Sequence, residues 1–283
     1  MSAQARKAEA FLRLHRADEI LVLLNAWDVA SARIFEAAGA RAIGTTSMGI
    51  AATHGYADGQ CIPLDTMLET VSRMAAAVRI PVSADMEAGY GKTTEQVVAS
   101  IVRAVDCGIV GINLEDGTGS TPPLLDPNAM AERIAAIRQA TTKLGLHLVI
   151  NARTDVYLVE VGSPEDRLAG AIARGNTYRE AGADCIFVPG GLDRDTIREL
   201  SREIDAPLNV VANPAISIPV VPAVSELQAL GVSRVSVGSG LTRAALSFAS
   251  RAAQEVLRDG TYNIMSEELA NAGQSYETAI GKA

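Results

Sequence analysis

The feature that most constrains the fold of this chain is a junction that recurs along it, in which a helix-like segment ends at or near a glycine and a short apolar run follows at once. Glycine is favoured at helix C-caps, and a short apolar run bounded in this way is typical of a buried strand. Recurrence of the junction indicates a strand–helix unit that is used many times. The junctions lie at residues 36–44, 106–113, 180–187 and 229–236.

Apolar runs of strand length occur eight times along the chain. Eight parallel strands that alternate with helices over 283 residues predict an α/β fold of the (β/α)8 barrel type. We expect one barrel domain over residues 1–283, in which residues 241–283 form a C-terminal helical extension. The expected strands lie near residues 20–24, 41–45, 80–84, 109–113, 147–151, 184–188, 207–211 and 234–238.

Charge and cysteine usage restrict the partners and the compartment. The net charge of −8 and the pI near 5.0, without any basic run, argue against nucleic acid and anionic membranes as partners. Cys61, Cys107 and Cys185 are odd in number and far apart, which favours free thiols over a disulfide framework or a zinc cluster. Residues 1–19 predict an amphipathic helix rather than a signal peptide, and no segment has the length of a membrane span. We therefore expect a cytoplasmic protein that binds a small molecule.

Polar side chains gather where the apolar runs end. The active sites of barrel enzymes lie at the C-terminal ends of the strands, so this pattern predicts a site there. Trp27, Thr45 and Asn213 are candidates for substrate binding, although Trp27 would equally suit simple packing. The polar residues at the strand ends are Asn25, Thr45, Thr46, Ser47, Asp85, Glu87, Glu115, Asp116, Asn151, Arg153 and Asn213.

The most informative strand end lies within residues 80–91, where an apolar run reaches Asp85 and Glu87 and then breaks into glycines. Residues two apart on a strand point to the same face, so the two carboxylates should converge on one cation. Carboxylate oxygens without a soft ligand suit Mg²⁺ that keeps part of its water shell.

Two other interpretations of this stretch are weaker. Gly91, Lys92 and Thr93 look like the end of a phosphate-binding loop, but Met86 stands where that motif needs its first glycine. Alternatively, Asp85 and Glu87 are only solubilising charges at a strand end. The recurrence of polar residues after successive apolar runs argues against this second alternative.

Five motifs occur in order: Gly-Thr-Thr-Ser-Met-Gly at 44–49 with Asp58 downstream, Ser-Ala-Asp-Met-Glu-Ala-Gly-Tyr-Gly at 83–91, Gly-Ile-Asn-Leu-Glu-Asp-Gly at 111–117, Asn-Ala-Arg-Thr-Asp at 151–155 and Ala-Gly-Ala-Asp at 181–184. In these motifs the chain resembles the isocitrate lyase and phosphoenolpyruvate mutase superfamily over about residues 23–247. Members of that superfamily cleave or form C–C or P–C bonds next to a 2-oxo or 2-hydroxy carboxylate.

The resemblance implies a role for each matching residue. Asp85, Glu87 and Glu115 would surround Mg²⁺, with Mn²⁺ as an alternative, and Asp58 would support that shell. The catalytic set would also include Thr46, Ser47 and Arg153, which would hold the carboxylate and the oxo group of an oxo acid substrate. Glu87 replaces an aspartate and Ser47 replaces a glycine that are common in the family, so the metal distance and the fit of the carboxylate should differ.

A larger departure follows Glu115. Isocitrate and methylisocitrate lyases carry a Lys-x-Cys-Gly-His loop there, whose cysteine protonates the product, whereas residues 117–126 contain no Cys, Lys or His. The mutases and phosphonopyruvate hydrolases place a lysine and an asparagine in this loop and a histidine after the sixth strand, where this chain has Val188, Pro189 and Gly190. Isocitrate and methylisocitrate should therefore be poor substrates.

Three functions remain open. Because the loop lacks the usual acid, a reaction that needs no mobile acid is favoured. Such a reaction is catalysed by an Mg²⁺-dependent C–C lyase or decarboxylase that acts on a small 2-oxo or 2-hydroxy dicarboxylate through an enolate. The loss of CO₂ from oxaloacetate is an example. P–C bond chemistry on a substrate that resembles phosphonopyruvate is the first alternative. A barrel that binds a dicarboxylate without turnover is the second.

The C-terminal region predicts an assembly. Residues 242–257 have the apolar spacing of a long helix, and residues 265–272 add a helical stretch that a minimal barrel does not need. Families that the chain resembles exchange their last helix between subunits. We therefore expect a homotetramer built from two helix-swapped dimers, against the alternative of a monomer with a locally packed tail.

Overall fold

The computed structural model describes residues 2–121, 123–214, 222–273 and 275–281. Eight parallel strands close into a barrel in which each strand pairs with its neighbours in chain order and β8 pairs with β1. The (β/α)8 fold predicted from the sequence is thus confirmed, and every expected strand overlaps an observed one. The strands are β1 Leu21–Ala26, β2 Ile43–Thr45, β3 Val82–Asp85, β4 Gly111–Glu115, β5 Val149–Arg153, β6 Cys185–Phe187, β7 Leu208–Val211 and β8 Arg234–Ser236.

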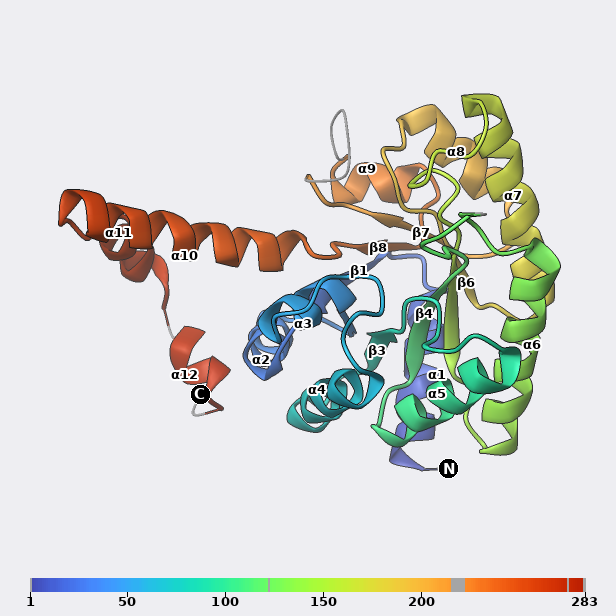
Figure 1. Ribbon diagram of the computed structural model, residues 1–283, viewed down its shortest axis with the longest axis horizontal. Coiled ribbons are helices and arrows are strands. Elements are labelled where there is room, and N and C mark those ends of the chain that lie inside the picture. The colour runs from blue at the N-terminus through green and yellow to red at the C-terminus, as the bar shows by residue number, and fades with distance from the viewer. Residues whose placement is uncertain (1, 122, 215–221, 274, 282–283) are drawn as a thin grey trace.

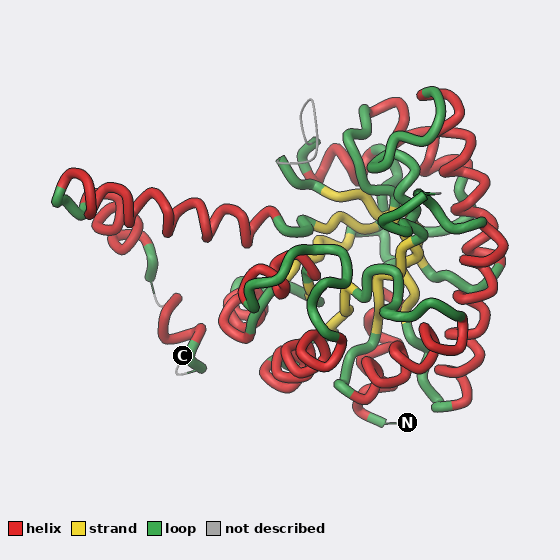
Figure 2. The backbone as a smooth tube through the Cα atoms, in the orientation of Figure 1, coloured by secondary structure: helices red, strands yellow, loops and turns green. Residues whose placement is uncertain are grey.

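Helices surround the barrel on the outside, as Figures 1 and 2 show. Several begin at residues that the sequence marks as caps: Asp28 and Thr93 each form a reciprocal capping box at the start of a helix. The helices of the shell and of the N-terminus are α1 Ala3–Leu14, α2 Val29–Ala37, α3 Ser47–Thr53, α4 Leu64–Ala77, α5 Thr94–Asp106, α6 Pro127–Lys143, α7 Pro164–Glu180, α8 Arg194–Glu203 and α9 Val224–Ala229.

Helix α1 closes the N-terminal end of the barrel. Its Phe11 is fully buried, and a Cβ added to Gly111 on β4 would lie 2.6 Å from the Phe11 ring. The glycine thus makes room for the ring inside the barrel. This closure leaves the opposite, C-terminal end of the strands as the accessible mouth.

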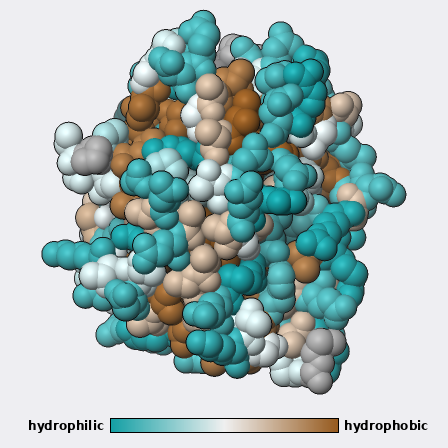
Figure 3. Space-filling view, turned by 90° about the vertical axis from the view of Figure 1, so that its right-hand side faces the viewer, coloured by the Kyte–Doolittle hydropathy of each residue, from teal (hydrophilic) through white to brown (hydrophobic). Residues whose placement is uncertain are grey.

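One face of the helical shell carries hydrophilic side chains around apolar areas (Figure 3). It is the face on the right-hand side of Figure 1. In the described part of the chain, no helix combines the length and the apolar character needed to cross a bilayer.

The C-terminal helices do not simply pack against the barrel as the last helix of the shell. Helix α10, Gly240–Asp259, projects away from the barrel as an arm, and α11, Asn263–Asn271, lies at its far end (Figure 1). Helix α12, Ser275–Ala279, returns to pack on α2, where the Arg33 guanidinium donates to the Ala279 carbonyl oxygen at 3.1 Å. Leu246 and Leu257 on the arm are 55% and 87% exposed.

Candidate active site

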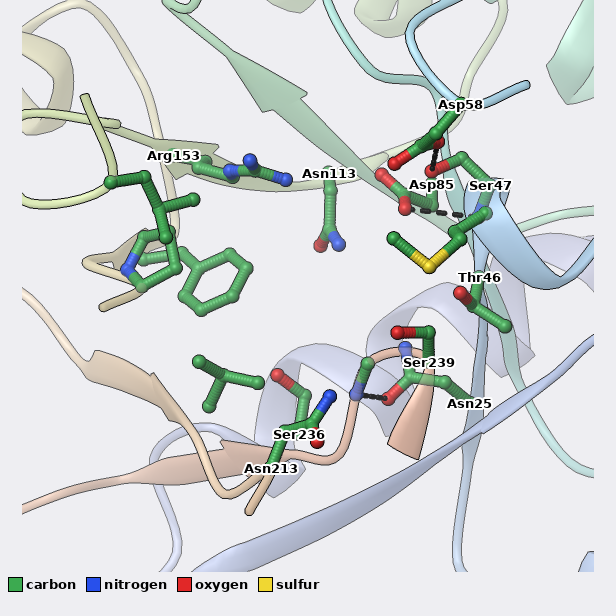
Figure 4. Close-up of a pocket in the computed structure, with 16 residues that line it drawn as sticks. Asn25, Thr46, Ser47, Asp58, Asp85, Asn113, Arg153, Asn213, Ser236 and Ser239 are labelled. Carbon is green, nitrogen blue, oxygen red and sulfur yellow. Dashed lines mark hydrogen bonds between the residues drawn. The ribbon is translucent and has the colours of Figure 1, made fainter. Parts of the chain in front are cut away.

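A cavity of about 190 Å³ opens at the C-terminal ends of the strands. Figure 4 shows that its polar side chains converge from opposite sides of the mouth. The only charged residues among the described lining are Asp58, Asp85 and Arg153. Asp85 and Arg153 end β3 and β5, and Asp58 lies between β2 and β3 in the chain. The other lining residues are Asn25, Thr46, Ser47, Met48, Asn113, Leu158, Phe187, Pro189, Val211, Asn213, Ser236, Gly238 and Ser239.

Asp85 is the last residue of β3 and is held from the neighbouring strand. Its backbone N–H donates to Thr45 Oγ1 at 2.9 Å, and its Oδ2 accepts from the Ser47 N–H at 3.1 Å. Its other carboxylate oxygen, Oδ1, is buried and has no hydrogen-bond partner among the described residues. A buried carboxylate oxygen without a donor is costly, so this atom is suited to a cation.

Asp58 lies beside Asp85 on the loop after α3. The Ser47 hydroxyl donates to Asp58 Oδ1 at 3.3 Å, so one serine holds both carboxylates through different atoms. Burial, and then the charge of Asp85, raise the pKa of Asp58 above its usual range. A carboxylate whose pKa is raised by a neighbouring negative charge is stabilised as an anion by a cation that lies between the two groups.

Glu87 lies differently from the prediction. Strand β3 ends at Asp85, and Glu87 has φ of 49°, in the left-handed region that non-glycine residues seldom adopt. The expectation that Asp85 and Glu87 extend from one face of a strand is therefore wrong. The Glu87 carboxylate accepts from the Gln60 N–H at 2.7 Å and from the Tyr90 hydroxyl at 2.8 Å, and it does not line the cavity.

Arg153 at the end of β5 carries carboxylates on both sides. Glu115, its register partner on β4, lies 2.8 Å from Nη1, and Asp155 accepts from Nε at 2.5 Å. The Phe187 ring lies 5.9 Å below the guanidinium carbon. Burial alone would lower the pKa of Arg153, but Glu115 and Asp155 outweigh it and raise that pKa. The guanidinium is thus fixed in place and permanently protonated.

The residues present fit a magnesium ion in part. Among the described residues, no three His, Cys, Asp or Glu side chains are gathered closely enough to hold a metal. Mg²⁺, however, is usually held by one or two carboxylates and several waters. Asp85, with its unpaired Oδ1, and Asp58 provide such a pair, whereas Glu87 and Glu115 already have partners.

Some of the residues predicted to bind the substrate line the cavity, and others do not. Thr46, Ser47 and Asn213 line the cavity, as Arg153 does. Thr45 is fully buried beneath it and supports Asp85, as described above. Trp27 is absent from the lining and packs edge-to-face on Phe35, with ring centroids 6.2 Å apart. The Ser47 N–H donates to Asp85 and is therefore not available to the substrate.

On the opposite side of the mouth, Asn25 and Asn213 were named from the sequence, but Ser236 and Ser239 were missed. Ser236 ends β8 and Ser239 follows it. Asn25, the second-last residue of β1, lies beside them, and its Oδ1 accepts from the N–H groups of Val237 and Gly238. Val211 at the end of β7 adds an apolar surface to this side, whereas the Phe187 ring lies under Arg153. Asn113 was missed as well, although it precedes Glu115 by two residues and therefore shares its strand face.

The loop after β4, which lacks the usual acid, is fastened to the barrel. Gly117 and Leu124 form an antiparallel bridge, and the Leu125 carbonyl accepts from Arg174 at 2.8 Å. Asp116, at the base of this loop, is fully buried and accepts from Tyr178 at 2.7 Å and from Arg174 at 3.0 Å. Asp116 therefore anchors the loop and does not face the cavity.

Comparison with known proteins agrees with this geometry. The family model for phosphoenolpyruvate phosphomutase matches residues 11–257. This chain belongs to the isocitrate lyase and phosphoenolpyruvate mutase superfamily. The superfamily groups lyases and mutases, so the chain has the fold and the mouth of such an enzyme.

Three relatives illustrate the range of the superfamily. A protein of Burkholderia cenocepacia J2315 that is provisionally described as a lyase/mutase has a crystal structure with 40% identity and a TM-score of 0.86, covering 93% of this chain and 92% of its own. The 2-methylisocitrate lyase of Halalkalibacterium halodurans is 26% identical over 98% of this chain and 90% of its own. The oxaloacetate decarboxylase of Pseudomonas fluorescens Pf-5 is 30% identical over 56% of this chain and 54% of its own.

Proposed function

We propose that this protein is a divalent-metal-dependent lyase that breaks the C–C bond next to the 2-oxo or 2-hydroxy group of a small dicarboxylate, with decarboxylation of a 2-oxo diacid as the preferred reaction. The observation that carries the proposal is the buried Oδ1 of Asp85, which has no partner among the described residues, beside Asp58 and in the same cavity lining as Arg153. This arrangement offers a cation site and an oxyanion site within one small cavity.

Asp85 and Asp58 would hold Mg²⁺, which Mn²⁺ could replace, and water would fill the rest of its shell. When bound, the metal supplies a Lewis acid that stabilises the enolate charge left after bond cleavage. The two carboxylates also orient each other through Ser47, so that the pair stays together before a ligand arrives.

Arg153 would bind the substrate carboxylate. Its charge is already balanced by Glu115 and Asp155, so the guanidinium contributes directed hydrogen bonds and adds little net positive charge to the cavity. A residue held in this way is pre-organised, which lowers the cost of orienting the substrate.

Return of a proton to the product would depend on a hydroxyl or on water, because residues 117–126 contain no acid of the usual kind. Ser239 is the best-placed hydroxyl. It lines the cavity, and its oxygen accepts from Arg243 Nε at 3.2 Å, which leaves its own hydrogen available to donate. The cationic neighbour makes that hydrogen more acidic.

The experiment is a screen of 2-oxo and 2-hydroxy acids with Mg²⁺, using proton NMR to identify the products. Turnover of a 2-oxo diacid to CO₂ and a 2-oxo monoacid, abolished by EDTA and restored by Mg²⁺, is the expected result. Release of phosphate or phosphoenolpyruvate from phosphonopyruvate would favour P–C chemistry instead. Tight oxo acid binding without turnover of any member of the panel would favour a binding protein.

We also propose that the protein acts as a homotetramer of helix-swapped dimers. The exposed Leu246 and Leu257 on the projecting α10 support this, because a solvated apolar arm is stabilised when a second copy covers it. Light scattering should give a mass near four chains of 29.6 kDa, and lysine at both leucines should lower it. A wild-type monomer with full activity would exclude the assembly.

A further inference from the structure

The interior of the barrel below the cavity is polar, where branched aliphatic layers are usual. Its most unusual member is Arg234 on β8, which is 1% exposed and forms no ion pair among the described residues. Burial lowers the pKa of Arg234 to about 10, which leaves the guanidinium protonated at neutral pH. The buried polar residues that share this interior are Ser83, Asn113, Asn151, Asn209 and Ser236.

Two neutral groups accept the hydrogen bonds of Arg234. Nη2 donates to Asn113 Oδ1 at 3.2 Å, and Nη1 lies 3.4 Å from His15 Nε2. Burial, and then the charge of Arg234, lower the pKa of His15 to about 3, so its ring is neutral. His15 Nδ1 lies 2.9 Å from the Phe11 carbonyl and donates to it, which leaves Nε2 as an acceptor for Arg234.

This contact fixes the orientation of the Asn113 amide. Arginine can only donate, so the oxygen of Asn113, and not its nitrogen, must face Arg234. Asn151 Nδ2 donates to the same oxygen at 2.8 Å. The Nδ2 group of Asn113 therefore points away from both donors.

The freed amide group lies at the cavity. Asn113 is among the lining residues, and Figure 4 shows its side chain between Arg153 on one side and Asp85 on the other. Nδ2 makes no hydrogen bond to any described residue and is not among the buried atoms that lack a partner, so it faces the open cavity. Asn151 Oδ1 and Asn209 Nδ2 also lack a described partner, but both are buried, whereas Asn113 Nδ2 is not among the buried atoms and can reach a ligand.

We propose that Asn113 Nδ2 donates a hydrogen bond to an oxygen of the bound oxo acid, and that Arg234 positions this donor by holding Asn113 Oδ1. The inference rests on the proposed function, from which it takes the oxo acid as ligand. It adds the residue that would contact this ligand, Asn113, and the residue that positions Asn113, Arg234. An oxygen that gains negative charge between Asp85 and Arg153 would be stabilised by a donor that is already oriented. Arg234 thus acts on the site through Asn113 and does not itself line the cavity.

The first test is a matched pair of substitutions, Asn113→Asp and Asn209→Asp, with binding of oxalate in the presence of Mg²⁺ measured by calorimetry. Oxalate is a stable mimic of a 2-oxo acid enolate. Asn209 is the register partner of Arg234 on β7, is fully buried and does not line the cavity, so both changes place a carboxylate in the same interior. Asn113→Asp removes the donor, keeps the side-chain shape and gives Arg234 a counterion.

We expect Asn113→Asp to lower oxalate affinity about 10- to 100-fold, the usual effect of losing a hydrogen bond to a charged group. Its melting temperature should equal or exceed that of the wild type, whereas Asn209→Asp should bind oxalate within about twofold of the wild type. Wild-type affinity in Asn113→Asp, or an equal loss in both variants, would overturn the inference. A wild type that neither binds oxalate nor turns over any oxo acid would instead overturn the proposed function on which the inference rests.

The second test separates positioning from direct contact. Arg234→Met removes the buried charge, and replacement of such a charge by an apolar side chain is often tolerated by the fold, which the melting temperature would check. If Arg234 acts through Asn113, the double variant Asn113→Ala, Arg234→Met should bind oxalate within about twofold of Asn113→Ala alone. If the losses of oxalate affinity in the two single variants multiply in the double variant, Arg234 acts independently of Asn113. If Arg234→Met does not fold, the comparison of Asn113→Asp with Asn209→Asp decides whether Asn113 contacts the ligand.

Discussion

The two sides of the barrel mouth differ in chemistry and in how they are held. The charged side, Asp58, Asp85 and Arg153, comes from strands β2 to β5 and is fixed by carboxylates, hydroxyls and ion pairs around it. The neutral side, Asn25, Asn213, Ser236 and Ser239, comes from β1, β7 and β8 and has apolar neighbours. The asymmetry suggests a division of work: the charged side supports the reaction, and the neutral side selects the rest of the substrate.

The charged side itself contains two kinds of carboxylate. Asp116 makes every contact that a buried carboxylate needs, from Arg174, Tyr178 and the Asp155 N–H. Asp85, in contrast, keeps one oxygen without a partner among the described residues. A paired carboxylate stabilises the fold, whereas an unpaired one at the mouth is available to a ligand.

The largest effect should come from Asp85→Asn. We expect activity to fall about a thousandfold or more, because the change removes a charge that the cation requires. The melting temperature should change little, since Oδ1 makes no hydrogen bond in the folded protein. Steady-state kinetics and thermal unfolding measure both quantities, with Asp18→Asn, an exposed site, as the control. Equal losses of activity and stability would mean that Asp85 is structural.

Asp116→Asn should show the reverse pattern. Removing this charge leaves Arg174 without its partner in a buried position, which costs about 3–5 kcal/mol of unfolding free energy. Urea unfolding would measure the loss. A variant as stable as the wild type would show that Asp116 does not anchor the loop, and the distinction between the two kinds of carboxylate would then fail.

A smaller effect is expected on the neutral side. Asn213→Ala should raise KM about tenfold, as for the loss of one polar contact to a ligand, and should leave kcat within a few-fold. The Mg²⁺ concentration for half-maximal activity should not change, because Asn213 lies across the mouth from Asp85 (Figure 4). Asn128→Ala on the surface of α6 is the control. A shift in metal dependence would remove the proposed division between the two sides.

The sequence was sufficient to predict the barrel. Its eight apolar runs and the glycines that mark helix ends reflect local preferences for strands and helix caps, and tertiary packing did not override these preferences. It also predicted most of the charged side, since strand ends of a parallel barrel meet at one face. Glu87 was placed wrongly because extension of a strand cannot be assumed beyond its last paired residue. Its positive φ turns the carboxylate toward Tyr90.

Other features depend on contacts between residues far apart in the chain, which spacing does not reveal. Trp27 was a candidate both for substrate binding and for packing, and its ring packs edge-to-face on Phe35. Ser236 and Ser239 carry no charge to distinguish them from ordinary loop residues. The orientation of the Asn113 amide is set by Arg234, 121 residues later in the chain.

The central claim, that a cation held by Asp85 at this mouth stabilises an enolate, is tested most directly by exchange of the C3 hydrogens of pyruvate in deuterated buffer, followed by proton NMR. Exchange reports enolate formation whichever group is cleaved from C3 in the natural substrate. The account predicts exchange with the wild-type protein and Mg²⁺, none above background after EDTA treatment, and none with Asp85→Asn. Exchange that persists without metal or in Asp85→Asn, or that never occurs with the metal-loaded wild type, would contradict it.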